Sequence, residues 1–143
     1  MKPEVDQILG LSASQLMGVL GPQLPQGFAQ GSASLLGIMM MLMAQEYDRA
    51  AEIRARENDD MRALFRDAAA KIADADLRTM VTRAGETRDA SLKISALNAE
   101  NTELRRVLIR LQAHAEEKSL ADIERRIWDV LKALADRRLI RLA

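Results

Sequence analysis

Charge is distributed very unevenly along this chain of 143 residues. Residues 1–45 carry only three charged side chains, Lys2, Glu4 and Asp6. All but one of the 21 basic residues and all but two of the 21 acidic residues lie after residue 45. The first third is therefore apolar and the rest is amphipathic. No polar linker separates the two parts, so we expect a single domain over residues 1–143.

The residue types favour helices almost throughout. Ala, Leu, Met, Arg and Glu, which are good helix formers, dominate the sequence, whereas aromatic residues make up only 3%. No alternating apolar–polar run, the pattern typical of a half-buried strand, exceeds four residues. We therefore expect an all-α fold, a bundle of four to six helices that includes one long helix and one helix with a heptad pattern.

Residues 1–27 predict short helices followed by a loop rich in Pro and Gly. Gly10 is expected to end the first helix. Ser12 and Gln15 have the spacing of a capping box, which predicts the start of a second helix that runs to about Leu20. The segment 21–27 contains Pro22 and Pro25 and should break the helix.

Residues 28–84 predict one long helix and one short helix. Apolar positions keep a helical phase from about Phe28 toward Ala73, a helix of about 45 residues, or roughly 67 Å at 1.5 Å per residue. Because that is long for a chain of this size, we expect a kink or a break near Glu57–Asp60, where Asn and Asp are good N-caps. The short helix is expected over Asp74–Arg83.

Residues 87–143 predict two further helices. In the first, expected over Thr87–Lys118, stripe positions recur at spacings of three and four over nearly four heptads: Ala90, Ile94, Leu97, Asn101, Leu104, Leu108, Leu111 and Ala115. Ser119 and Asp122 match a helix start signal, so we expect the last helix to begin at Ser119. Its apolar face consists of Leu120, Ile123, Ile127, Val130, Leu131 and Leu134.

Asn101 is the one polar residue in the heptad stripe. In a coiled coil, a lone Asn at such a position fixes register and oligomeric state at a cost in stability. Alternatively, this position faces solvent or a gap between crossing helices. If the amide is buried, we expect it to be hydrogen-bonded to Asn101 of a second chain or to a polar group on a neighbouring helix, because an unpaired buried polar group costs about 1–3 kcal/mol.

The longest apolar run, residues 35–44, is rich in methionine. It is about half as long as the ~20 residues that a membrane-spanning helix needs, so we expect no membrane span. Such a segment is typical of a helix buried on all sides. Met39, Met40 and Met43 therefore predict a subunit interface or a ligand cavity, with ordinary core as the alternative. Left exposed, the run would exceed the apolar patches normal for monomers, so we expect a homodimer through Leu35–Met43.

Glu46, Tyr47 and Arg49 directly follow the apolar run. One interpretation is a polar pocket, in which Glu46 and Asp48 act as acid or base and Arg49 holds an anion. The other interpretation is that a buried helix emerges into water at this point.

Several kinds of function are disfavoured by composition. The chain has no cysteine and a single histidine, His114, so it cannot supply the thiolate or paired imidazole ligands of the usual transition-metal sites, and we expect no metal and no cofactor. Equal numbers of basic and acidic residues and few aromatics argue against nucleic-acid binding. No phosphate-binding loop or nucleophile elbow occurs, so an enzyme is the third-ranked class.

The layout of Leu20-Gly21-Pro22-Gln23-Leu24-Pro25, followed by an apolar helix into Ala44-Gln45-Glu46, resembles a family of small bacterial helical proteins of unknown function. Members are often encoded beside acyl-CoA dehydrogenases and aminoglycoside-phosphotransferase-like kinases. The resemblance covers about residues 5–65 and implies an accessory role near fatty-acyl metabolism. It supplies no catalytic residue.

Together these patterns predict a non-enzymatic accessory or interaction protein that self-associates through its helices. The alternative is a binder of an apolar, acyl-chain-like small molecule in a methionine-lined cavity. The start of the sequence lacks the basic and apolar segments of a secretory signal, so we expect a cytoplasmic protein.

Overall fold

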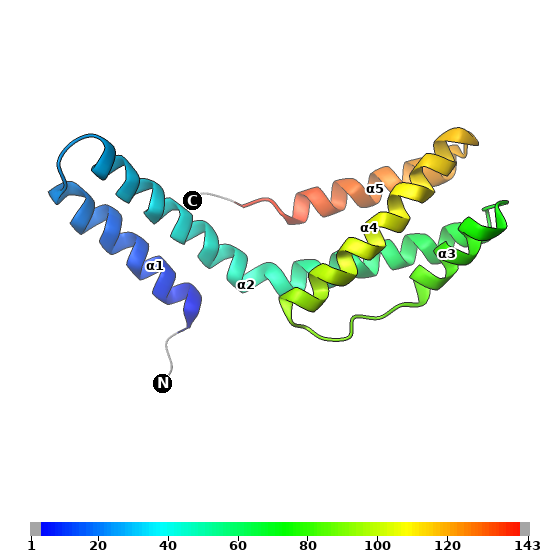
Figure 1. Cartoon of the computed structure of the whole chain (residues 1–143), viewed down its shortest axis with the longest axis horizontal. Helices are drawn as coiled ribbons and strands as arrows, with labels where there is room; N and C mark the ends of the chain where they lie inside the picture. Colours follow the sequence, from blue (N-terminus) through cyan, green and yellow to red (C-terminus); the bar gives the residue numbers. More distant parts are fainter. Residues whose placement is uncertain (1–3, 141–143) are drawn as a thin grey trace. The chain divides into compact units, whose positions relative to one another are not determined.

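A computed structural model describes residues 4–140 of the chain. Within this range the chain forms α-helices and no strand, which confirms the all-α class with one long helix and one heptad-patterned helix (Figure 1). The α-helices are α1 (Val5–Gln15), α2 (Phe28–Ala69), α3 (Ala75–Glu86), α4 (Ile94–Glu117) and α5 (Ala121–Arg137).

The chain divides into two compact units, and α2 contributes to both. The first unit contains α1 and the N-terminal part of α2, up to Ala50. The second unit covers Ala51–Leu139. This division differs from the single domain that we expected. It falls close to the change in charge near residue 45, so the compositional boundary also marks a structural one.

The first unit is a helical hairpin. α1 continues into a π-helical turn, η1 (Leu16–Leu20), and a short 3-10 turn, η2 (Gly21–Gln23). The prediction that Gly10 ends a helix and that Ser12 caps a second one is wrong. Of the described glycines, Gly27 alone has a positive φ, 119°, so the reversal before α2 is made there while the helix passes through Gly10 without interruption.

Small residues bring the two arms of the hairpin together. Figure 1 shows α1 running antiparallel beside the first part of α2. A Cβ atom added to Gly37 of α2 would lie 2.3 Å from Cγ of Met17, and one added to Gly21 would lie 3.9 Å from Cβ of Ala33. Ala13 of α1 is completely buried. The arms therefore approach closely only because glycine and alanine occupy the contact.

The second unit holds the apolar core. This core is one cluster of buried side chains to which α2, α3, α4 and α5 all contribute. It includes residues of the predicted heptad stripe of α4 and of the predicted apolar face of α5. It consists of Met61, Leu64, Phe65, Ala68, Ile72, Leu77, Val81, Ala84, Leu104, Leu108, Leu111, Ala115, Ile123 and Ile127. Of the kink or break predicted near Glu57–Asp60, the break is wrong, because α2 is helical through these residues. Their polar side chains find partners on other parts of the second unit instead of capping a new helix.

In the second unit, a capping side chain marks the start of α3. The Asp74 side chain accepts a hydrogen bond of 2.7 Å from the Leu77 backbone N–H and caps α3. α4 begins at Ile94, not at Thr87 as expected, because residues 87–93 form a loop. Ala90 of the predicted stripe therefore lies in that loop, exposed.

The connection between α4 and α5 is a Schellman turn. The Leu120 N–H donates to the Ala115 carbonyl (2.8 Å), the Ser119 N–H donates to the Glu116 carbonyl (3.3 Å), and Ser119 has a φ of 52°. The prediction that Ser119 starts the last helix is wrong, since α5 begins at Ala121 with no side-chain cap. Ser119 occupies the position that glycine usually takes after a helix.

Candidate functional site

The apolar run of α2 is exposed rather than buried. Leu35, Leu36, Ile38, Met39 and Met43, which we call the hairpin surface, have exposed fractions of 59%, 52%, 40%, 46% and 48%. The interpretation of this run as core of the single chain is therefore wrong. The hairpin has only two arms, and on its α2 arm, residues 28–50, the buried residues are Ala33, Gly37 and Ala50.

Tyr47 extends the exposed stripe by one turn. It is 57% exposed and follows Leu36, Met39 and Met43 at helical spacing, so these four side chains share one face of α2. Met40 is half-buried, as are Glu46 and Arg49, which both interact with neighbouring groups. The predicted ligand and interface candidates are thus neighbours on one helix, and the exposed ones form a surface rather than the lining of a cavity.

Helix α2 also meets the length and composition of a membrane-spanning helix. Its most apolar window of 18 residues has a mean hydropathy of 1.2 and is 11% buried. The core helix of a soluble protein can pass the same test of composition, so this property by itself does not distinguish a bilayer from a protein partner.

Four polar residues are buried in the second unit: Glu57, Asn58 and Arg62 of α2 and Asn101 of α4. Glu57 is 0% exposed, and the guanidinium of Arg138, just after α5, donates to both of its carboxylate oxygens at 2.5 Å. Arg105 of α4 approaches the same carboxylate at 3.5 Å. This bidentate pair joins the end of α5 to the middle of α2.

Asn101 joins α4 to the same cluster. Its amide N–H groups donate to Glu57 Oε2 (3.1 Å) and Asn58 Oδ1 (2.9 Å), and its carbonyl accepts from Arg105 (2.8 Å). The neighbouring-helix partner that we considered for a buried Asn101 is therefore present within one chain. Both amide N–H groups and the carbonyl oxygen of Asn101 thus have partners within one chain.

Arg62 anchors the loop between α3 and α4. It is 3% exposed and donates to Asp89 (2.7 Å), Glu100 (3.1 Å) and the Thr87 hydroxyl (3.1 Å). Asn58 also donates to Asp89, at 2.9 Å. These bonds explain why residues 87–93 leave the helix that the sequence predicts, because Thr87 and Asp89 bond to α2 from the loop.

The network changes the acidity of its carboxyl groups. Burial by itself raises the pKa of Glu57, but the hydrogen bond and charge of Arg138, with the charges of Arg54 and Arg105, outweigh it and lower that pKa. Burial likewise raises the pKa of Asp89, and its bonds to Arg62 and Asn58 outweigh this effect and lower it. Both groups are therefore held as carboxylates, which suits a structural ion-pair cluster better than proton transfer near neutral pH.

Sequence reasoning found Asn101 but missed Glu57, Asn58, Arg62 and Arg138. The sequence placed Glu57 at an expected kink or break of the long helix, not in a buried network. The spacing of Glu57 along the helix could have indicated its burial. Glu57 lies four residues after buried Ile53 and four before buried Met61, so a continuous helix places its side chain on the buried face. Nothing local in the sequence indicated Arg138, which lies 81 positions from Glu57.

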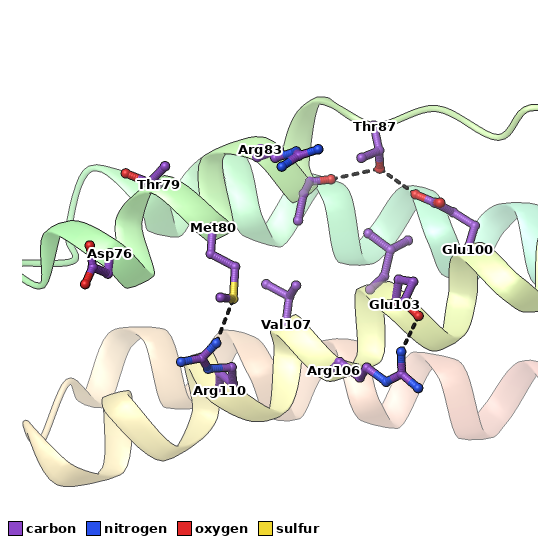
Figure 2. Close-up of a pocket in the computed structure, with 12 residues that line it drawn as sticks. Asp76, Thr79, Met80, Arg83, Thr87, Glu100, Glu103, Arg106, Val107 and Arg110 are labelled. Carbon is purple, nitrogen blue, oxygen red and sulfur yellow. Dashed lines mark hydrogen bonds and ion pairs between the residues drawn. The ribbon is translucent and has the colours of Figure 1, made fainter.

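A groove of about 800 Å³ lies between α3 and α4 of the second unit (Figure 2). Met80 and Val107 face each other across it, and Arg110 reaches over to the sulfur of Met80. Its lining also includes Asp76, Thr79, Arg83, Ala84, Thr87, Glu100, Glu103, Leu104 and Arg106. The methionines of the hairpin surface do not line this groove.

Metal ligands do not gather anywhere in residues 4–140: no group of three His, Asp or Glu side chains there could hold an ion. His114, the single histidine, is half-buried on α4. No protein-family model, curated protein or solved structure matches the chain. The resemblance to the small bacterial helical proteins thus remains an expectation based on residues 5–65.

Proposed function

We propose that this protein is a helical interaction protein that self-associates through the hairpin surface of its first unit. The observation that carries the proposal is the exposure of five large apolar side chains, Leu35, Leu36, Ile38, Met39 and Met43, on consecutive turns of one helix. Continuous apolar patches of this kind on soluble proteins usually mark interaction sites. We infer an accessory role in the cytoplasm rather than catalysis.

The two arms of the hairpin differ in a way that favours a second copy as the partner. Between Leu35 and Met43 every exposed side chain of α2 is apolar, whereas α1 exposes Gln7, Ser14 and Gln15 as well as apolar residues. Two hairpins that pack α2 against α2 would bury the apolar faces in the middle and leave these polar groups in water. The result would be a four-helix arrangement of the common antiparallel type.

A bilayer fits the same distribution less well. Residues 7–45 lack charge but contain ten Gln and Ser side chains, spread over both arms and the connecting turn. In a bilayer, hydrocarbon would surround both arms. These polar side chains would then lose their hydrogen bonds to water, and the lipid chains would offer no hydrogen bonds in return. A protein partner needs to cover only one face.

Replacing Met39 and Met43 together by lysine tests the proposal. Two buried, unpaired ammonium groups should abolish the dimer, so light scattering at micromolar concentration should give the mass of one chain for the variant and of two chains for the wild type. The matched control is Ile109→Lys, at an apolar residue 66% exposed on α4 of the second unit, which should stay dimeric.

Two results would overturn the proposal. One is a wild type that is monomeric at these concentrations and floats with phospholipid vesicles, which would assign the hairpin surface to a bilayer. The other is a double variant that remains dimeric, which would place the interface elsewhere. The alternative function, a small-molecule binder with a methionine-lined cavity, loses its support because Met39 and Met43 lie on an open face.

A further inference from the structure

The groove between α3 and α4 has an apolar floor. Ala84 and Leu104 are 8% and 1% exposed and form its base, and Met80 and Val107 are half-buried above them. Its volume of about 800 Å³ lies within the range of roughly 300–1,000 Å³ typical of small-molecule sites. The floor would therefore accept the apolar part of a small ligand.

The charged rim of the groove is unequally neutralised. α3 contributes the exposed carboxylate of Asp76 and the exposed guanidinium of Arg83. On α4, Glu100 accepts from Arg62 (3.1 Å) and from the Thr87 hydroxyl (2.6 Å). Glu103 forms an ion pair with Arg106 on the same helix. Both acidic groups of α4 are thus already engaged with neighbouring side chains.

Arg110 is different, because its hydrogen bond goes to the thioether sulfur of Met80 at 3.5 Å (Figure 2). A thioether is a weak acceptor, and among the described residues no carboxylate forms an ion pair with Arg110. Arg110 is exposed, and Figure 2 shows its guanidinium directed from α4 toward Met80 on α3. A guanidinium in this position is suited to a planar anionic group that carries an apolar chain.

We propose that the groove between α3 and α4 binds a small amphipathic anion, with a carboxylate or phosphate head group at Arg110 and an apolar chain along Met80, Val107 and Leu104. The anion replaces the thioether as the partner of Arg110 and gains a charge-assisted hydrogen bond. The chain covers half-buried apolar side chains. This site lies within the second unit and does not depend on self-association through the hairpin surface.

The methionines allow a direct test, because they report separately on each part of the molecule. In a protein labelled with ¹³C at the methionine methyl groups, Met80 reports on the groove, Met61 on the core of the second unit, and Met39 and Met43 on the hairpin surface. Titration with octanoate and with octyl phosphate should shift the Met80 resonance saturably and leave Met61 in place. Octyltrimethylammonium, with the same chain and a positive head group, should not shift Met80.

Arg110→Gln should weaken octanoate and octyl phosphate binding at least fivefold, with the Met61 resonance unchanged as evidence of an intact core. The matched control is Arg125→Gln, at an exposed arginine of α5 outside the groove, which should bind as the wild type does. Comparing the two anions separates a carboxylate site from a phosphate site.

Three outcomes would overturn this inference: no shift of Met80 with either anion, an equal shift with octyltrimethylammonium, or shifts confined to Met39 and Met43. The last outcome would assign the amphiphile to the hairpin surface. The light-scattering experiment on the Met39 and Met43 lysine variant does not depend on this titration. Self-association through the hairpin surface and anion binding in the groove can therefore be refuted separately.

Discussion

The two units of this protein use apolar residues in opposite ways. In the second unit, apolar side chains follow one face of each helix, and charged side chains cover the other; fourteen of them form a buried cluster. In the first unit most positions are uncharged, yet the buried residues among those that the structure describes are all small: Ala13, Gly21, Ala33, Gly37 and Ala50.

The comparison shows that apolar content does not make a core. A core needs several elements that can surround a side chain, and a hairpin of two helices offers each side chain one neighbour. The second unit encloses even the charged Glu57, because α4 and Arg138, just after α5, supply its partners. The following predictions test this contrast, from the largest expected effect to the smallest.

Glu57→Gln should destabilise the second unit by about 3 kcal/mol, at the low end of the cost of breaking a buried ion pair. The loss is moderate because Arg105 and Arg138 have side chains 36% and 42% exposed and can turn toward water. Chemical denaturation followed through the Met61 methyl resonance measures the effect. Glu103→Gln, which breaks an exposed pair, is the control and should change stability by less than ~0.5 kcal/mol. A similar loss in both variants would show that the buried network contributes no more than a surface pair.

Acid should destabilise the second unit through the same carboxylates. The pKa values of Glu57 and Asp89 are lower in the folded protein than in the unfolded chain, so the folded state binds fewer protons. Their contribution to the free energy of unfolding is complete above the pKa values of the unfolded chain, about 4.3 for Glu and 3.9 for Asp. It is lost as the pH falls through the lower pKa values of the folded protein. The free energy of unfolding can be measured between pH 6 and pH 2.5, roughly the range that spans these pKa values. It should decrease once the pH is lower than about 4.5. The fall should be shallower for Glu57→Gln, and identical curves would contradict this assignment.

Asn101→Leu should destabilise the protein by about 2 kcal/mol without changing its mass in solution. The substitution removes the donor to the buried Asn58 Oδ1, and a buried acceptor without a partner costs about 1–3 kcal/mol. Glu57 Oε2 loses one donor but keeps its bond from Arg138. Melting and light scattering on the same samples measure both quantities. An altered mass would return Asn101 to the role of an oligomer determinant.

Gly37→Leu should separate the arms of the hairpin and leave the second unit intact. Its Cβ alone would lie 2.3 Å from Met17 Cγ, so the larger side chain must displace α1, at a cost of about 1–2 kcal/mol. The Met17 resonance should change and the Met61 resonance should not. Gly31→Leu is the control, since nothing lies within 4 Å of a Cβ at that position. A simultaneous change at Met61 would show that the two units unfold together.

Ser119→Gly should stabilise the second unit by about 1 kcal/mol. Ser119 adopts a φ of 52°, where a side chain costs roughly 1–2 kcal/mol and glycine does not. The gain is partly offset by the greater freedom of glycine in the unfolded chain. A rise in melting temperature measures it, and Ser91→Gly, in the loop before α4, should not show the same rise. A loss of stability at position 119 would indicate that the serine side chain stabilises the turn.

Periodicity alone determined the helical class, the long helix, the buried stripe of α4 from Leu97 to Ala115 and the apolar face of α5. These features follow from side-chain spacing within one helix, where residues three and four apart share a face in any surroundings. Asp74 was predicted close to the start of α3 for a similarly local reason. A capping side chain bonds to its own first turn.

The tertiary structure decided which polar residues are buried and which apolar residues remain exposed. Glu57 and Arg138 are partners across 81 positions, and their pairing depends on the return of α5 to α2. Asn58 and Arg62 of α2 likewise bond to Thr87 and Asp89, in a segment where the sequence predicts a helix and the structure has a loop. Conversely, Leu35–Met43 has the composition of a core but too few neighbours to become one. Burial depends on how many elements surround a position, and local sequence does not contain that number.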